Sequence, residues 1–190
     1  LNDVITNRLV KFFLLPVLRK IEAIVFNYAI HINLISAGFS GYFSKYTRPQ
    51  YSYYTNGIDQ EFIQPSTFEE LLSSSPITIT YAGNIGEGQG LHKIIPQAAK
   101  MLGNGYHFKV FGDGGARKYL EEAIEKEKLI NVSIEKPVKR AELLEIYKRS
   151  HYLFMHLNDY AAFEKVLPSK VFELGAFPRP IIAGVNGYAR

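Results

Sequence analysis

The chain has 190 residues, of which 47% are hydrophobic and 21% are charged, enough for one core and a smaller second piece. It contains no cysteine, which excludes a disulfide framework and thiolate chemistry. The net charge of +4 suits anionic ligands or anionic lipid but is too diffuse to indicate nucleic acid. Polar and charged residues interrupt the stretch 12–35, so no apolar run reaches transmembrane length.

The first part of the chain predicts one helix and two short strands. Apolar residues recur every three or four positions over residues 5–30, where Pro16 is expected to kink or divide the helix. The strand candidates are 31–36 and 51–55, and the polar stretch 65–75 reads as a loop. The apolar, basic helix either packs in a neighbouring domain or lies on a membrane. The width of its apolar face favours packing.

From residue 77 onward, strands and helices alternate. This alternation predicts an α/β fold, a Rossmann-like parallel sheet with helices on both faces. Pro96 falls inside one of the expected helices, where a proline is unfavourable. The expected strands are 77–82, 106–111, 131–135, 152–157 and 181–183, and the expected helices are 91–102, 116–129, 140–149 and 170–177. Ligands of such sheets bind in the loops that follow the carboxyl ends of the strands.

The loop after the first of these strands is rich in glycine. Its glycines, which let a backbone approach a ligand closely, are Gly83, Gly86, Gly88 and Gly90. The spacing is not that of the dinucleotide fingerprint, so the loop is either a ligand contact or a flexible connection. The next loop begins at Gly112 and is either a tight turn or a second ligand contact, with the turn favoured for its aspartate.

The segment 167–173 is the most informative part of the chain. Ser169 is a preferred N-cap residue, and the first-turn amides of Ser169, Lys170 and Val171 would lack helical partners and could bind an anion. Glu173, one turn further on, could accept two hydroxyl hydrogen bonds from a sugar ring. An ordinary capped helix is the alternative, although Phe172 occupies the position where a capping box needs Glu or Gln.

Other catalytic patterns are missing from the sequence. The five histidines show no metal-ligand spacing, and no Gly-x-Ser-x-Gly elbow occurs. His156 ends a predicted strand and either touches a ligand or is a satisfied polar group. No carboxylate cluster for Mg²⁺ is visible, so no metal and no cofactor are expected.

Taken together, these segments resemble the C-terminal half of a two-domain retaining glycosyltransferase of family 4, with the GT-B fold. The resemblance spans roughly residues 30–190, and the linker-like 56–62 precedes the nucleotide-sugar domain. The segments that carry it are Gly83-Asn84-Ile85, Gln89-Gly90, Phe111-Gly112-Asp113-Gly114, Ala141-Glu142-Leu143-Leu144, Pro168-Ser169-Lys170-Val171-Phe172-Glu173 and Pro180-Ile181-Ile182. The form Leu-Pro-Ser-Lys-x-Phe-Glu is most similar to the L-fucosamine transferase branch of bacterial surface polysaccharide synthesis.

The resemblance implies a domain plan and a donor site. Residues 1–62 would be the end of the acceptor-binding domain and its linker, and 63–190 a nucleotide-sugar-binding domain truncated at its C-terminus, so that the piece could bind donor without transferring it. Glu173 would hold the ribose. The implied substrate-binding residues are Gly83, Asn84, Gly86, Gln89, Gly90, Gly112, Ser169, Lys170, Val171 and Glu173. No catalytic residue is assigned.

Three positions depart from the family pattern. Asn84 and Gln89 stand where the family commonly has Arg and Lys reaching the diphosphate, and Lys170 would replace that charge. Lys165 stands where the family has the first of two glutamates. The adjacent Glu164 cannot be given that role.

The expected function is therefore transfer of a sugar, such as an amino-deoxyhexose, with retention from a nucleoside diphosphate donor to a lipid-linked or glycan acceptor. Helix-terminal amides and Lys170 would stabilise the departing nucleoside diphosphate without a metal. The expected location is the cytoplasm, or the periphery of the inner membrane. The alternative is a nucleotide-sugar-binding or epimerising protein of the same fold, because a fold does not determine function.

Overall fold

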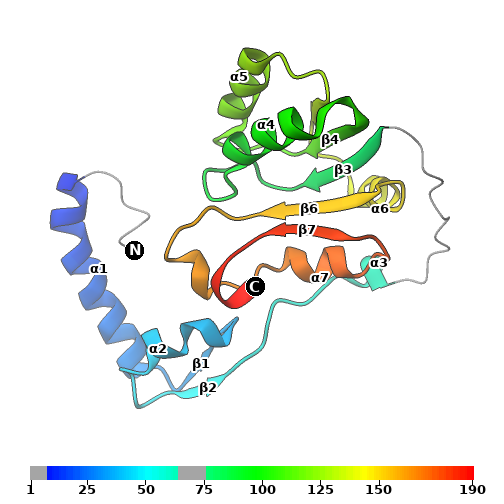
Figure 1. Ribbon diagram of the computed structural model, residues 1–190. Helices are drawn as coiled ribbons and strands as arrows, with labels where there is room; N and C mark the ends of the chain where they lie inside the picture. Colours follow the sequence, from blue (N-terminus) through cyan, green and yellow to red (C-terminus); the bar gives the residue numbers. More distant parts are fainter. Residues whose placement is uncertain (1–7, 64–75) are drawn as a thin grey trace. The chain divides into compact units, whose positions relative to one another are not determined.

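The computed structural model describes residues 8–63 and 76–190, which fall into two compact units (Figure 1). Unit 1 takes the chain up to Asn56, together with Asp159–Pro168 and Asn186–Arg190. Unit 2 takes Gly57–Asn158 and Ser169–Val185. The chain thus returns to unit 1 twice after entering unit 2. The expected roles of the two parts, acceptor-domain remnant and nucleotide-sugar domain, stay predictions.

Unit 1 is built on helix α1 (Arg8–Tyr28), which runs through Pro16 without a break. The expectation that this proline could divide the helix was wrong. A proline removes a single backbone hydrogen bond, and the cooperative helix on either side of it continues. Strands β1 (His31–Asn33) and β2 (Gln50–Ser52) pair in parallel, and the short helix α2 (Ser40–Phe43) lies between them in the sequence. The pair is shorter than the sequence predicts.

Unit 2 contains a five-stranded parallel sheet with the order β5-β4-β3-β6-β7 (Figure 1). The strands are β3 (Ile77–Ala82), β4 (Tyr106–Phe111), β5 (Val132–Glu135), β6 (Tyr152–His156) and β7 (Ile181–Gly184). The helices are α3 (Gln60–Ile63), α4 (Leu91–Leu102), α5 (Arg117–Glu127), α6 (Arg140–Lys148) and α7 (Lys170–Gly175). The expected α/β class is confirmed. The missed elements are α2, α3 and short 3-10 turns.

Both faces of this sheet are covered, as expected for parallel strands. Along β6, Phe154 enters the cluster that packs under α4 and α5, whereas its neighbours Leu153 and Met155 enter the cluster under α3, α6 and α7. This alternation follows the two-residue period of a strand. Pro96 is buried within an unbroken α4. The two cores hold the strands in register and so place the loops at their carboxyl ends.

The predicted loop 65–75 lies outside the described ranges. Within them, no helix combines the length and the apolarity needed to cross a bilayer.

Candidate functional site

The strand order of unit 2 places a switch point between β3 and β6. The chain runs outward from β3 through β4 to β5 and then crosses to the other side of β3 to form β6 and β7. In open parallel sheets, ligands bind outside the carboxyl ends of the strands at such a point. The glycine loop follows β3, and the segment leading to α7 follows β6. All ten residues implied by the resemblance belong to unit 2.

The structure brings the start of the glycine loop against helix α7. A Cβ atom added to Gly83 would lie 3.2 Å from Cε and 3.5 Å from Nζ of Lys170. Lys170 Nζ also lies 3.4 Å from Oε2 of Glu173, one turn along the helix. About a quarter of each side chain is exposed, 24% for Lys170 and 30% for Glu173, so the pair can be reached by a ligand. The residues predicted to bind the phosphate and the ribose are therefore adjacent.

The side-chain amides of Asn84 and Gln89 form hydrogen bonds within the glycine loop. Asn84 Nδ2 donates to Oε1 of Gln89 at 3.0 Å, and the amide of Gly86 donates to the same oxygen at 3.2 Å. The carbonyl of Asn84 accepts a hydrogen bond of 2.6 Å from the hydroxyl of Tyr81. These bonds pre-organise the loop without supplying a positive charge, which leaves Lys170 as the cation beside Gly83.

Residues at the end of β6 and directly after it form hydrogen bonds with the C-terminal part of this loop. Gly90 has φ +61°, and a Cβ at that position would lie 2.1 Å from Oδ1 of Asn158. The side chain of Asn158 donates to the carbonyl of Glu87, and its amide donates to Gly88 at 2.8 Å. His156 Nδ1 donates to the carbonyl of Gln89 at 2.7 Å. His156 therefore makes a hydrogen bond within the protein through Nδ1, and Gly90 is required by packing.

Sequence reasoning missed Asn158. The signal available for it is an amide side chain directly after a predicted strand at the ligand-binding edge of the sheet. Nothing local to this segment indicates which loop the side chain would join, because its partners are distant in sequence.

Gly112 joins the two loops that follow β3 and β4. Its φ is +158°, and a Cβ there would lie 1.9 Å from the carbonyl oxygen of Gly83. The Gly83 amide donates to Phe111 at 2.9 Å, and the Ile85 amide donates to Asp113 at 2.7 Å. This contact requires glycine, because a side chain at this position would overlap the carbonyl oxygen of Gly83. The contact holds the two loops close together.

The beginning of α7 differs from the expected capped helix. Ser169 occupies the N-cap position, but its side chain makes no capping hydrogen bond. Its φ and ψ of −57° and −27° are helical, whereas a capping side chain reaches the following amides from an extended residue. Among the described residues, the amides of Lys170 and Val171 have no intrahelical partner, whereas the amide of Phe172 donates to the carbonyl of Ser169 at 3.0 Å.

Two buried tyrosines lie beneath this edge of the sheet. Burial raises the pKa of Tyr81, and burial together with the nearby carboxylate of Glu173 raises the pKa of Tyr147. The hydroxyl oxygen of Tyr147 is buried and has no hydrogen-bond partner among the described residues. Both phenols are therefore neutral at physiological pH.

The described residues contain no group of three or more His, Cys, Asp or Glu side chains that could hold a metal ion. The arrangement instead offers one ammonium, one carboxylate and the amides of a helix start. Such groups can bind a diphosphate and a vicinal diol.

No family model matches the chain, and no curated protein matches it either. Solved structures do resemble it. TarM from S. aureus superimposes with a TM-score of 0.61 at 11% identity, over 86% of this chain and 32% of TarM. HepE from Anabaena gives a TM-score of 0.63 at 16% identity, over 84% of this chain and 45% of HepE.

The lipopolysaccharide outer core galactosyltransferase WaaB gives a TM-score of 0.64 at 16% identity, over 85% of this chain and 45% of WaaB. The chain therefore spans less than half the length of each of these three proteins. At such identities the likeness establishes the fold. The fold is an α/β architecture whose helix-flanked, five-stranded parallel sheet matches the C-terminal Rossmann-like half of GT-B glycosyltransferases.

Proposed function

We propose that this chain is the donor-binding part of a retaining glycosyltransferase and that it binds a nucleoside diphosphate sugar at the carboxyl edge of unit 2. The observation that carries the proposal is the Lys170–Glu173 pair beside Gly83, next to the switch point of the sheet. The structures of TarM and HepE contain UDP, which makes UDP the first nucleotide to test here.

Each residue of the pair has a distinct role in this proposal. Lys170 contacts the diphosphate, together with the free amides at the start of α7 and the backbone of Gly83. Glu173 accepts hydrogen bonds from the ribose hydroxyls. As the sugar–phosphate bond breaks, negative charge grows on the leaving diphosphate, and a fixed cation with oriented amides stabilises that charge.

The glycine loop forms the wall of the same site. Its internal bonds among Asn84, Gly86 and Gln89 keep it in place before a ligand arrives, so little ordering entropy is lost on binding. Gly90 and Gly112 anchor its two ends. We propose that the loop touches the donor through its backbone and its two amide side chains.

The finer assignment is also a proposal. The Leu167–Glu173 motif favours membership of family 4 and its L-fucosamine transferase branch, with an amino-deoxyhexose as the donated sugar and bacterial surface polysaccharide as the product. The acceptor would be lipid-linked or a glycan, and the enzyme would act at the cytoplasmic side of the inner membrane.

Calorimetric titration of the folded chain with UDP, GDP, ADP and the parent nucleosides tests the donor site. We expect saturable binding of at least one nucleoside diphosphate, weakened in Lys170→Met. Lys126→Met is the matched control, because Lys126 is an exposed lysine in the last turn of α5, away from the carboxyl ends of the strands. If no nucleoside diphosphate binds to the folded chain, the proposed function is wrong.

A further inference from the structure

A fully buried tyrosine of unit 2 has an unused hydroxyl group. Tyr147 lies on α6, and its hydroxyl has no hydrogen-bond partner among the described residues. A buried polar group without a partner costs free energy, so such groups are rare in folded proteins. The groups that surround this hydroxyl therefore decide what it can do.

Tyr147 packs beneath α7, the helix that carries the proposed donor-site pair. Its side chain shares a core cluster with Leu174, which directly follows Glu173, and Val171 packs against the same cluster. Its ring centre lies 5.1 Å from that of Phe177, just beyond the end of α7. Burial raises the pKa of Tyr147, and the carboxylate of Glu173 raises it further, so that charge lies close to the phenol.

The carboxylate of Glu173 can accept more hydrogen bonds than it does. In the part of the chain that the structure describes, Lys170 is its hydrogen-bonding partner, through Oε2 at 3.4 Å, which is long for such a bond. Oε1 accepts no hydrogen bond from any described residue. A buried donor without an acceptor and a carboxylate with an unused oxygen therefore lie in the same neighbourhood.

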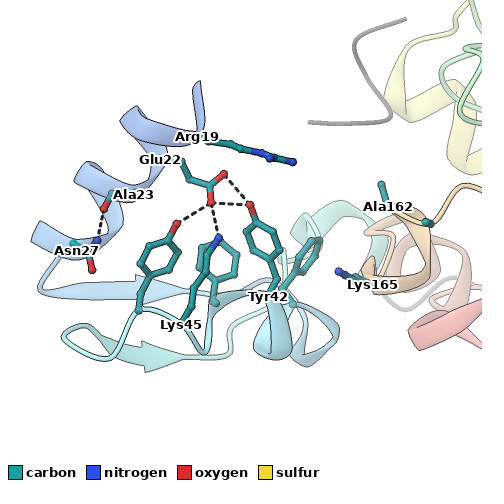
Figure 2. A pocket seen from close by; sticks show the side chains of 12 residues that line it. Arg19, Glu22, Ala23, Asn27, Tyr42, Lys45, Ala162 and Lys165 are labelled. Carbon is teal, nitrogen blue, oxygen red and sulfur yellow. Dashed lines mark hydrogen bonds and ion pairs between the residues drawn. The ribbon is translucent and has the colours of Figure 1, made fainter. Parts of the chain in front are cut away.

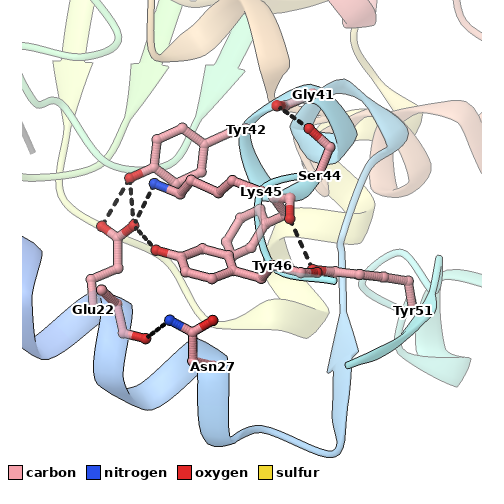
Figure 3. A network of polar contacts seen from close by, with 10 residues as sticks. Glu22, Asn27, Gly41, Tyr42, Ser44, Lys45, Tyr46 and Tyr51 are labelled. Carbon is pink, nitrogen blue, oxygen red and sulfur yellow. Dashed lines mark hydrogen bonds and ion pairs between the residues drawn. The ribbon is translucent and has the colours of Figure 1, made fainter. Parts of the chain in front are cut away.

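Unit 1 contains the same kinds of groups in a completed arrangement, beside a pocket of about 790 Å³ (Figure 2). Glu22 accepts from the Tyr42 hydroxyl at 2.7 Å, from the Tyr46 hydroxyl at 2.9 Å and from Lys45 Nζ at 3.3 Å (Figure 3). One carboxylate of this chain thus takes a lysine and two phenols together. In unit 2 the carboxylate, the lysine and a phenol are present, but the phenol is not bonded.

We propose that Tyr147 is a positioning residue for Glu173, whose carboxylate accepts a hydrogen bond from the Tyr147 hydroxyl when Lys170 turns to the diphosphate of a bound nucleotide. This inference rests on the proposed function, because the diphosphate is the group that draws the ammonium away. Lysine binds phosphate as readily as carboxylate. The phenol then replaces the lost cation and leaves the other carboxylate oxygen for the ribose hydroxyls.

This exchange of partners accounts for the unused hydroxyl. In the free chain the phenol makes no bond, so it adds nothing to the stability of the fold. A hydrogen bond that forms only in the bound state adds to the affinity for the ligand instead. The ring of Tyr147 is already fixed by packing, so forming that bond costs little ordering of the phenol.

The first experiment needs no nucleotide. The full chain is labelled at tyrosine Cζ for NMR, and the signal of Tyr147 is identified by its loss in Tyr147→Phe. In Lys170→Met the carboxylate has lost its cation, so the phenol should bond to it without a ligand and the Tyr147 signal should shift. Adding Glu173→Ala should remove the shift, and Lys126→Met should not cause one. An unmoved signal in Lys170→Met would overturn the inference.

The second experiment is calorimetric titration of Tyr147→Phe with UDP, GDP, ADP and pyrophosphate. Affinity for the nucleoside diphosphate that the wild type binds should fall about tenfold, as expected for one hydrogen bond to a charged group. Affinity for pyrophosphate, which has no ribose, should stay unchanged. Tyr106→Phe is the matched control, because it removes a half-buried phenol at the amino end of β4, and it should bind like the wild type.

Urea unfolding separates a positioning role from a structural one. Tyr147→Phe should be at least as stable as the wild type, because the hydroxyl has no bond to lose in the free chain. Equal losses of affinity for nucleotide and pyrophosphate, or a less stable variant, would make Tyr147 a structural residue and overturn the inference.

Failure of this inference and failure of the proposed function give different results. If the wild type binds a nucleoside diphosphate and Tyr147→Phe binds it equally well, the inference is wrong and the proposed function stands. If no nucleoside diphosphate binds to the wild type, the proposed function is wrong and the exchange on ligand binding fails with it. A shifted Tyr147 signal in Lys170→Met would then still support the bond between Tyr147 and Glu173.

Discussion

Lys170 and Glu173 form an ion pair on one turn of α7, with Nζ and Oε2 3.4 Å apart, and Lys170 simultaneously lies against Gly83. The pair is partly exposed, so by itself it contributes little to stability. Its position matters more, because a ligand that reaches the pair meets a cation and a carboxylate side by side. The first two predictions separate their roles.

Glu173→Ala should weaken binding of a nucleoside diphosphate by about 1.5–3 kcal/mol, the range for hydrogen bonds to a charged group. The reason is loss of the acceptor for the ribose hydroxyls. The measurement is calorimetry with the ribose and deoxyribose forms of the nucleotide. The deoxyribose form should bind the wild type more weakly, and the variant should bind both forms equally. If the variant loses the same affinity for both forms, Glu173 has no role at the ribose.

Lys170→Met should reduce affinity for the diphosphate much more than affinity for the nucleoside, because only the diphosphate meets the ammonium. The salt dependence of binding should also become flatter, since one charge–charge interaction has been removed. Titrations at low and high salt with both ligands measure this difference. An equal loss for nucleoside and diphosphate would assign Lys170 a structural role instead.

Gly112→Ala should destabilise the chain by more than about 1 kcal/mol, because the residue has a positive φ and its Cβ would overlap the carbonyl oxygen of Gly83. Urea unfolding followed by circular dichroism measures the change. Gly105→Ala is the control, since a Cβ at that exposed position meets nothing within 4 Å. A Gly112→Ala chain as stable as this control would show that the two loops can move apart at little cost.

Glu22→Gln should make unit 1 less sensitive to acid. Hydrogen bonds from Tyr42, Tyr46 and Lys45 hold the folded-state pKa of Glu22 below its unfolded value, despite the opposing effect of burial. The ionised carboxylate therefore contributes stability above the unfolded pKa, and this contribution is lost as the pH falls through the folded pKa.

Urea midpoints measured from neutral to acidic pH check this prediction. The wild type should lose more stability on acidification than Glu22→Gln, while Glu125→Gln, at an exposed carboxylate, should behave like the wild type. Identical pH profiles for the wild type and Glu22→Gln would contradict it.

The sequence by itself determined the α/β class of unit 2, because strand and helix periods are local and the loops between them are marked by glycine and proline. The spacing within the Leu167–Glu173 motif also placed Lys170 and Glu173 on one turn of the helix, whatever the position of that helix in the fold. It could not indicate that Ser169 would adopt helical dihedral angles and so fail to cap the helix.

Only the tertiary structure decided which loops meet. The crossing from β5 to β6 sets the switch point, and sheet order depends on contacts between residues far apart in the chain. The contact of Gly83 with Lys170 and the bonds of Asn158 to the glycine loop follow from that order. The turn that carries Lys165 likewise packs against Gly38, and no local pattern in either segment encodes the other.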